Sequence, residues 1–214
     1  ELAGESMSSG AWGPWARYEA AVNHLYAPFR ATAMCAYDTN ALPPVVLADI
    51  EATHPCVARV DGVRFNSLYQ DPDAFLQKLS VPPDPLEATR VSVESVDPDL
   101  SSARQAVRVA AAGCAIDADD VEDLVAGVSE VVANAQLYGR APVLLRVWAA
   151  ADRMIAVVSD EGSGPLFAYA GLVPVDAASG GRGLWITHQM CGQVDHVTGA
   201  TGFAVRLATS PPRG

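Results

Sequence analysis

The stretch Ser129-Glu130-Val131-Val132-Ala133-Asn134-Ala135 decides most about the fold of this 214-residue chain. It lies in a predicted helix that Asp117 caps and that runs to about Leu137. Apolar residues recur along this helix at 3.6-residue spacing and predict one buried stripe: Val121, Leu124, Val125, Val128, Val132 and Ala135. At about 100° per residue, Glu130 and Asn134 lie one turn apart on the opposite face. The helix therefore presents a carboxylate and an amide together, away from the core.

Two glycine-containing motifs follow this helix. Asp160-Glu161-Gly162-Ser163-Gly164-Pro165 comes directly after an apolar strand, so it places a carboxylate at a sheet edge, followed by backbone that can approach a ligand closely. Gly180-Gly181-Arg182-Gly183-Leu184 leads into a helix, where unpaired N–H groups and the positive end of the helix dipole favour an anion. Taken singly, each feature is also typical of a solvated surface or an ordinary turn. Their order along the chain is more informative.

In this order, three segments resemble motifs of the GHKL (histidine kinase-like) ATPases, most closely those of the bacterial anti-sigma factor serine kinases. Residues 129–135 resemble the N box, and Asp160-x-Gly162-x-Gly164 and Gly181-Arg182-Gly183-Leu184 resemble two glycine boxes. The resemblance covers about residues 89–209. It implies an α+β fold, the two-layer α/β sandwich of Bergerat type, in which a mixed sheet lies under helices and ATP is held between helices and a mobile lid.

The resemblance also implies a role for each matching position. Glu130 would be the general base or the carboxylate that polarises water, Asn134 would give an amide oxygen to Mg²⁺, and Asp160 would accept a hydrogen bond from the adenine amino group. The later glycines would cradle the phosphates, and residues 165–179 would form the lid. The implied ATP-binding residues are Asn134, Asp160, Gly162, Gly164, Gly181, Arg182, Gly183 and Leu184.

The residue chemistry agrees with binding of ATP and Mg²⁺. The chain has no GxxxxGK[ST] motif, and its single lysine, Lys78, lies outside all three segments, which excludes a P-loop. Triphosphate charge must therefore be met by Mg²⁺, by backbone N–H groups and by arginine, for which Arg182 is the obvious candidate. Glu130 beside a metal-bound phosphate would be placed to deprotonate an attacking hydroxyl.

The residues leave three functional hypotheses open. The favoured one is an ATP-binding anti-sigma factor regulator, whose partners would be a sigma factor and an anti-anti-sigma (STAS-type) protein, with serine/threonine kinase activity on the latter, because Glu130 is retained. The second is a nucleotide-gated protein that sequesters its partner without phosphorylating it. It is favoured by Tyr138-Gly139 and Gly202-Phe203, where family members often have His-Gly and Gly-Thr. The third is an ATPase module of a sensor histidine kinase-like system. It is less favoured because the sequence before residue 91 has no phospho-accepting histidine on a dimerisation helix. We also allow for a homodimer.

The first half resembles part of the MEDS sensory domain, a module found ahead of such ATPase domains in actinobacteria. The matching pieces are Tyr18-Glu19, Cys35-Ala36-Tyr37-Asp38, Leu42-Pro43, His54-Pro55 and Tyr69-x-Asp71-Pro72. The resemblance implies a small organic signal as ligand. It begins midway through the module, and the chain opens on glutamate rather than methionine, so we expect that the chain lacks its own N-terminus.

We predict three parts: residues 1–79 as a partial MEDS-like sensory domain with a small α/β fold, 80–88 as a Pro- and acid-rich linker, and 89–209 as the ATPase domain. In the first part, the order helix, strand, helix, strand indicates parallel pairing: residues 15–25, 32–37, 43–53 and 56–60. In the last part, we predict strands over 91–96, 143–150, 154–159, 193–197 and 204–208. The predicted helices there cover 97–112, with Asp97 as cap, 117–137 and 183–191.

Composition excludes several classes of protein. Half of the residues are apolar and mean hydropathy is +0.16, so the chain is not a disordered acidic protein. The net charge of −11 is spread over both halves without a basic patch, which argues against direct nucleic-acid binding. Charged residues interrupt the apolar stretch 141–159, which predicts two strands rather than a membrane span, and no signal peptide is visible. The abundance of Ala, Val, Asp and Arg suggests a GC-rich bacterial genome.

Cysteine and histidine offer weaker candidates. The four cysteines have no disulfide-like spacing and predict reduced, mostly buried thiols in a cytoplasmic protein. They are Cys35, Cys56, Cys114 and Cys191. His54-Pro55-Cys56 and His188-x-x-Cys191 offer two metal donors each, whereas structural zinc takes four, so ordinary packing or solvation is the favoured interpretation. Aromatic residues near the first helix are likewise more typical of a core than of a ligand groove: Trp12, Trp15, Tyr18 and Tyr26.

Overall fold

The computed structural model describes residues 9–27, 29, 32–79, 81–166, 170–172, 182–199 and 202–210. The chain divides into two compact units. The first lies within Glu1–Ser80, and the second comprises Val81–Leu166 together with the residues from Ala170 on. Each unit has its own apolar core.

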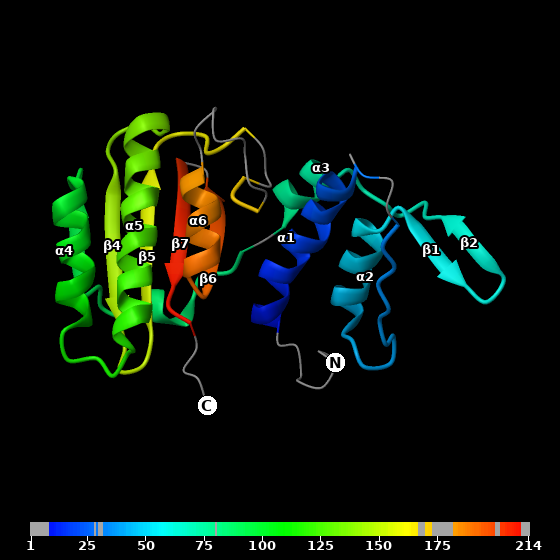
Figure 1. Cartoon of the computed structure of the whole chain (residues 1–214), viewed down its shortest axis with the longest axis horizontal. Coiled ribbons are helices and arrows are strands. Elements are labelled where there is room, and N and C mark those ends of the chain that lie inside the picture. Colours follow the sequence, from blue (N-terminus) through cyan, green and yellow to red (C-terminus); the bar gives the residue numbers. More distant parts are fainter. Residues whose placement is uncertain are drawn as a thin grey trace. The chain divides into compact units, whose positions relative to one another are not determined.

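The second unit is an α+β two-layer sandwich, as the sequence predicts (Figure 1). Its five-stranded sheet has the order β3-β4-β5-β7-β6, and the strands are β3 (Val93–Val96), β4 (Leu144–Ala149), β5 (Met154–Asp160), β6 (Gln193–Gly199) and β7 (Gly202–Ala208). One face carries the helices α4 (Leu100–Ala111), α5 (Ala118–Tyr138) and α6 (Arg182–Met190). All paired strands in this sheet are antiparallel, whereas the family resemblance implies a mixed sheet.

Helix α5 is the central helix of this layer. The Asp117 carboxylate caps it by accepting a hydrogen bond from the Asp119 N–H, as predicted. The predicted stripe is buried at Leu124, Val125, Val128, Val132 and Ala135, with Val121 packed at its margin. A second side is also buried, because α6 packs on it at Gly127. A Cβ at position 127 would lie 2.7 Å from the Cys191 sulfur, so the absence of a side chain lets the two helices approach.

The opposite face of the sheet is covered by the segment that precedes β3. Strand residues alternate between the two faces, and those facing away from the helices form a second, smaller cluster. It comprises Trp148, Ile155 and Ala208, with Leu86, Val91 and Val157 packed against them. The short 3₁₀ helix η1 (Pro85–Ala88) supplies Leu86 to this cluster.

A buried ion cluster fastens this covering segment to β7. Arg206 donates to Asp195 Oδ2 through Nε and Nη2, at 3.0 and 2.8 Å, and both side chains are buried. Its Nη1 donates to Glu87 Oε1 at 2.6 Å and to the Pro82 carbonyl at 2.9 Å. Residues 81–88, predicted as a linker, are therefore part of the second unit. The ion pairs that hold them join residues far apart in the sequence, so local composition does not indicate them.

The first unit packs three helices, α1 (Ser9–Tyr26), α2 (Pro44–Thr53) and α3 (Pro72–Lys78). Their buried core consists of Trp12, Ala16, Ala20, Val46, Ile50, Ala52, Phe75 and Leu76. A hairpin of β1 (Cys56–Arg59) and β2 (Gly62–Phe65) extends away from these helices (Figure 1). The helices over 15–25 and 43–53 and the strand at 56 are thus confirmed.

Two predictions for the first unit are wrong. Residues 32–38, which the structure describes, form no strand, and Met34 is 81% exposed. A short apolar run does not by itself distinguish a strand from other extended chain. The predicted parallel pairing is also wrong, because β1 pairs antiparallel with β2, its neighbour in the sequence.

Smaller corrections concern caps and cysteines. Asp99, not Asp97, caps α4, since its carboxylate accepts from the Ser102 N–H. Asp97 instead adopts a φ of 47° and accepts from the Val143 N–H. The cysteines are less buried than predicted: Cys35 and Cys56 are exposed, Cys114 is half-buried, and Cys191 is buried. In the described part of the chain, no helix has both the length and the apolar character needed to span a bilayer.

Candidate functional site

Glu130 and Asn134 meet the N-terminal end of α6. Glu130 is exposed and Asn134 half-buried, on the face of α5 that the periodicity predicts. A Cβ at Gly183 would overlap Glu130 Oε2 and would lie 3.5 Å from the Asn134 side-chain nitrogen. The absence of a side chain at position 183 therefore leaves the space that the Glu130 carboxylate occupies. Two oxygen-bearing side chains and the first turn of a helix share one small region.

The start of α6 contributes backbone donors and one cation. Its first N–H groups have no partner within the helix, which makes this end attractive to anions. The Arg182 side chain is exposed there, and Leu184 packs on the core beneath. Gly181 and most of the predicted lid, residues 165–179, lie outside the described residues.

Asp160 ends β5 and is surrounded by glycines from three segments. A Cβ at Gly139, after α5, would lie 2.6 Å from the Asp160 carboxyl carbon, and one at Gly162 would lie 2.6 Å from Oδ1. A Cβ at Gly202, which begins β7, would overlap the Asp160 carbonyl oxygen. Side chains at these three positions would displace Asp160 from the sheet edge.

The two oxygens of the Asp160 carboxylate differ in their partners. Oδ1 accepts the N–H of Arg140 at 3.1 Å and that of Gly162 at 2.6 Å. Among the described residues, none donates a hydrogen bond to Oδ2, which leaves it able to accept one from a ligand. Gly139 follows Asn134 by five residues, about 7.5 Å of helical rise, so α5 joins the two groups at a defined spacing.

Phe203 fills the space beside Gly164. Gly164 has a φ of 76°, which favours glycine, and a Cβ there would overlap the Phe203 ring. The ring also packs edge-on against His196, with centroids 5.5 Å apart. Tyr138 is 74% exposed. The two departures from the family pattern thus differ, since Phe203 contacts a predicted site residue whereas Tyr138 faces solvent.

Sequence reasoning missed the contributions of Gly139, Arg140 and Gly202. The Tyr-Gly pair directly after the predicted helix was the available signal for Gly139, because glycine commonly follows a helix end. Nothing in the local sequence indicates that Gly202 contacts Asp160.

Residues 94–209 match the family model of the histidine kinase-like ATPase domain, which is more than half of the chain. The chain belongs to the histidine kinase-like ATPase family. Residues 3–55 match the MEDS family model, the methanogen/methylotroph, DcmR sensory domain. A sensory-type module and an ATPase domain are thus combined in one chain, and among curated proteins none matches it.

Solved structures with similarity to the chain include two signalling proteins. The RsbU and RsbW domains of Rv1364c from Mycobacterium tuberculosis are 20% identical, with a TM-score of 0.38, over 57% of this chain and 34% of that one. The histidine kinase domain of the EL346 blue-light activated histidine kinase from Erythrobacter litoralis is 20% identical, with a TM-score of 0.34, over 53% of this chain and 61% of that one. The chain thus spans about a third and about three fifths of the lengths of these two proteins.

Cys191 and the aromatic residues of α1, the weaker candidates from the sequence, differ in their burial. Burial raises the pKa of the Cys191 thiol to about 12, which disfavours the thiolate that a metal requires. Cys191 therefore fits the packing interpretation. Of the aromatic residues on α1, Trp12 is buried in the core as expected, but the core interpretation is wrong for Trp15, Tyr18 and Tyr26, which are at least 39% exposed.

Proposed function

We propose that the second unit binds Mg·ATP and transfers the γ-phosphoryl group to a serine or threonine of an anti-anti-sigma (STAS-type) partner, and that the same surface binds a sigma factor. The observation that carries this proposal is the meeting of Glu130 and Asn134 with the start of α6. Membership in the ATPase family supports the nucleotide, and the order of the three motifs supports the anti-sigma class of kinase.

Asp160 is suited to recognise the adenine ring. Its Oδ1 is held by two backbone N–H groups, so the carboxylate is oriented before the ligand arrives. Oδ2 can then accept from the adenine amino group, which a buried pocket would leave unpaired without it. Because positions 139, 162 and 202 are glycines, no side chain from these positions shields the carboxylate.

The donor set near α6 fits Mg²⁺. This ion takes oxygen ligands and keeps several waters beside substrate phosphates, so one amide oxygen from Asn134 is a sufficient protein contribution. When bound, Mg²⁺ would neutralise charge on the β- and γ-phosphates. The backbone N–H groups at the start of α6 and the exposed Arg182 supply the remaining positive charge.

Glu130 is placed to act as the general base. It is exposed, so a serine hydroxyl of a partner protein can reach its carboxylate. The hydroxyl oxygen forms a bond to the γ-phosphorus while the bond from that phosphorus to the β–γ bridging oxygen breaks. ADP leaves, and the hydroxyl proton moves to Glu130.

The test is single-turnover transfer from γ-labelled ATP to a STAS-domain substrate, combined with calorimetry of Mg·ATP binding. Glu130→Gln keeps the size of the side chain and removes the base and a negative charge. We expect ATP affinity to hold or rise while transfer falls by about 10²–10⁴-fold. Asn134→Ala removes the oxygen ligand to Mg²⁺, so affinity and transfer should both fall. Transfer by Glu130→Gln at the wild-type rate would remove Glu130 from the role of base.

One observation favours the sequestering alternative. Phe203 replaces the threonine of the family pattern and its ring lies against Gly164, so this side of the site is more apolar than in typical members. If the wild-type chain binds ATP tightly and captures its partner but phosphorylates none of the STAS substrates, nucleotide-gated sequestration replaces the kinase proposal.

A further inference from the structure

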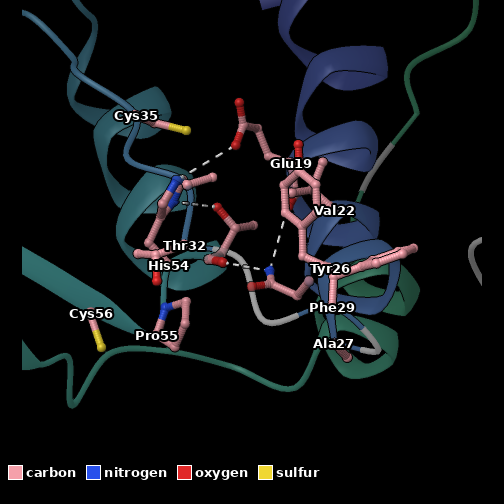
Figure 2. A pocket seen from close by; sticks show the side chains of 13 residues that line it. Glu19, Val22, Tyr26, Ala27, Phe29, Thr32, Cys35, His54, Pro55 and Cys56 are labelled. Atoms are coloured by element: carbon pink, nitrogen blue, oxygen red, sulfur yellow. Dashed lines mark hydrogen bonds and ion pairs between the residues drawn. The ribbon is translucent and has the colours of Figure 1, made fainter.

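The first unit contains a cavity of about 400 Å³ that is separate from the ATPase motifs (Figure 2). Its walls come from α1, from the segment 32–35, and from the junction of α2 and β1. Apolar and aromatic side chains form part of the lining, among them Val22, Tyr26 and Phe29. Three other lining residues have side chains that can bind a metal: Glu19, Cys35 and His54.

Three of these side chains converge. One ligand atom each from Glu19, Cys35 and His54 lies within 4.8 Å of the other two. Figure 2 shows the Cys35 sulfur and the Glu19 carboxylate on the same side of the His54 ring, with a dashed line joining Glu19 to His54. A carboxylate oxygen, a thiolate sulfur and an imidazole nitrogen are the ligand types of Zn²⁺, which tolerates all three.

The hydrogen bonding of His54 prepares its other ring nitrogen for a metal. Nδ1 lies 2.8 Å from the Ile50 carbonyl oxygen, which can only accept, so Nδ1 carries a hydrogen and Nε2 is the ring nitrogen that a metal would use. Metal-binding histidines commonly make this second bond to a backbone carbonyl. Nε2 is 3.6 Å from Glu19 Oε2, too far for a hydrogen bond. Two ligands of one tetrahedral ion, each about 2.0–2.1 Å from it, lie about 3.4 Å apart.

Glu19 places a buried carboxylate at this cluster. Its side chain is 6% exposed, and its Oε2 lies 3.6 Å from His54 Nε2. Buried carboxylates are rare unless they are paired or bind a metal. A divalent cation would compensate Glu19.

We propose that Glu19, Cys35 and His54 bind one divalent ion of the zinc type, with its fourth coordination position open to the cavity. With three protein ligands, the fourth position of such a site is taken by water or by a bound small molecule. The cavity would then admit a small molecule that binds the ion directly. The cluster thus joins His54 to Cys35, 19 positions earlier, and not to Cys56, two positions later.

The experiment uses the tag-free full chain, reduced and stripped of metal with EDTA, and titrated with Co²⁺ as a spectroscopic substitute for Zn²⁺. We expect one equivalent to produce a thiolate-to-cobalt charge-transfer band, which Zn²⁺ then abolishes by displacement. Cys35→Ser should remove the band. The matched control is Cys56→Ser, which changes a cysteine of the same cavity wall outside the cluster and should retain it. A band that persists in Cys35→Ser, or that is lost in Cys56→Ser, overturns the proposal.

A second measurement separates a metal ligand from a structural residue. Zn²⁺ should raise the melting temperature of the wild type and of Asn134→Ala, which alters the ATPase motif alone. Glu19→Gln and His54→Gln should fold without metal, as circular dichroism would check, yet lose the Zn²⁺-dependent rise. Their Zn²⁺ affinity should fall by more than the roughly 10–100-fold that the loss of an outer-shell partner costs. Wild-type Zn²⁺ affinity in either variant overturns the proposal.

Discussion

Glu130 Oε2 occupies the space in which a Cβ at Gly183 would lie. The two residues are 53 positions apart and belong to different helices, α5 and α6. Glu130 is an exposed side chain that can move, whereas the backbone of Gly183 is part of a helix that packs on the core. A substitution at position 183 therefore tests the position of the carboxylate more than the stability of the fold.

Gly183→Ala should displace Glu130 while leaving the fold intact. The added methyl group pushes away the far end of a flexible side chain, and alanine favours a helix over glycine by about 1 kcal/mol. We expect an unchanged or slightly higher melting temperature and at least tenfold slower phosphoryl transfer, a modest share of what a general base contributes. Thermal unfolding and single-turnover transfer measure the two effects. A variant that transfers at full rate would separate Gly183 from the site.

Asp160→Asn should lose ATP affinity at little cost in stability. The amide oxygen can still accept the N–H groups of Arg140 and Gly162, but an NH₂ group replaces the oxygen that would meet the adenine amino group. We expect ATP binding to weaken by about 1–3 kcal/mol, the cost of an unpaired buried polar group. Calorimetry with ATP measures this.

GTP gives the matched control for Asp160→Asn. Guanine has a carbonyl where adenine has the amino group, so the variant should discriminate less between the two nucleotides than the wild type does. Equal ATP affinity in wild type and variant would remove Asp160 from adenine recognition.

Asp195→Ala should destabilise the second unit strongly. It removes the carboxylate that accepts hydrogen bonds from two nitrogens of the buried Arg206 guanidinium. Breaking a buried ion pair costs about 3–5 kcal/mol of folding stability. Denaturant unfolding should show the loss. The control is Glu122→Ala, which breaks an ion pair with Arg108 on the exposed surface and should change stability far less. Similar effects of the two substitutions would contradict the role of the cluster.

Acid should weaken the attachment of the segment before β3. Burial opposes the charge of Asp84, but the Leu86 N–H and the Arg153 guanidinium outweigh it and lower the pKa of Asp84 below its ordinary 3.8. Below pH 3.8 the unfolded chain then binds more protons than the folded one, so the stabilisation is present above that pH and is lost as pH falls through the folded pKa.

The comparison is the free energy of unfolding of wild type and Asp84→Asn from pH 5 to pH 2. The wild type should lose more stability over this range than the variant does. Asp152→Asn, which removes an exposed carboxylate from the β4–β5 turn, should follow the wild type. Parallel curves for wild type and Asp84→Asn would contradict the prediction.

Local periodicity predicted most of the second unit. The stripe on α5, the cap at Asp117 and the β4–β5 hairpin are properties of consecutive residues, which helix and strand geometry relate directly to one another. For the same reason, the placement of Glu130 and Asn134 on one helix face followed from their spacing of four.

The sequence by itself therefore determined the elements of the ATPase domain, its family and the shared face of Glu130 and Asn134. Only the tertiary structure decided that residues 81–88 cover the sheet, that glycines from three segments surround Asp160, and that Cys35 meets Glu19 and His54. These relationships depend on close approach between segments far apart in the chain. Periodicity relates a residue only to its near neighbours, so a buried ion pair or a glycine contact across 42 positions, such as Asp160 with Gly202, leaves no local signal.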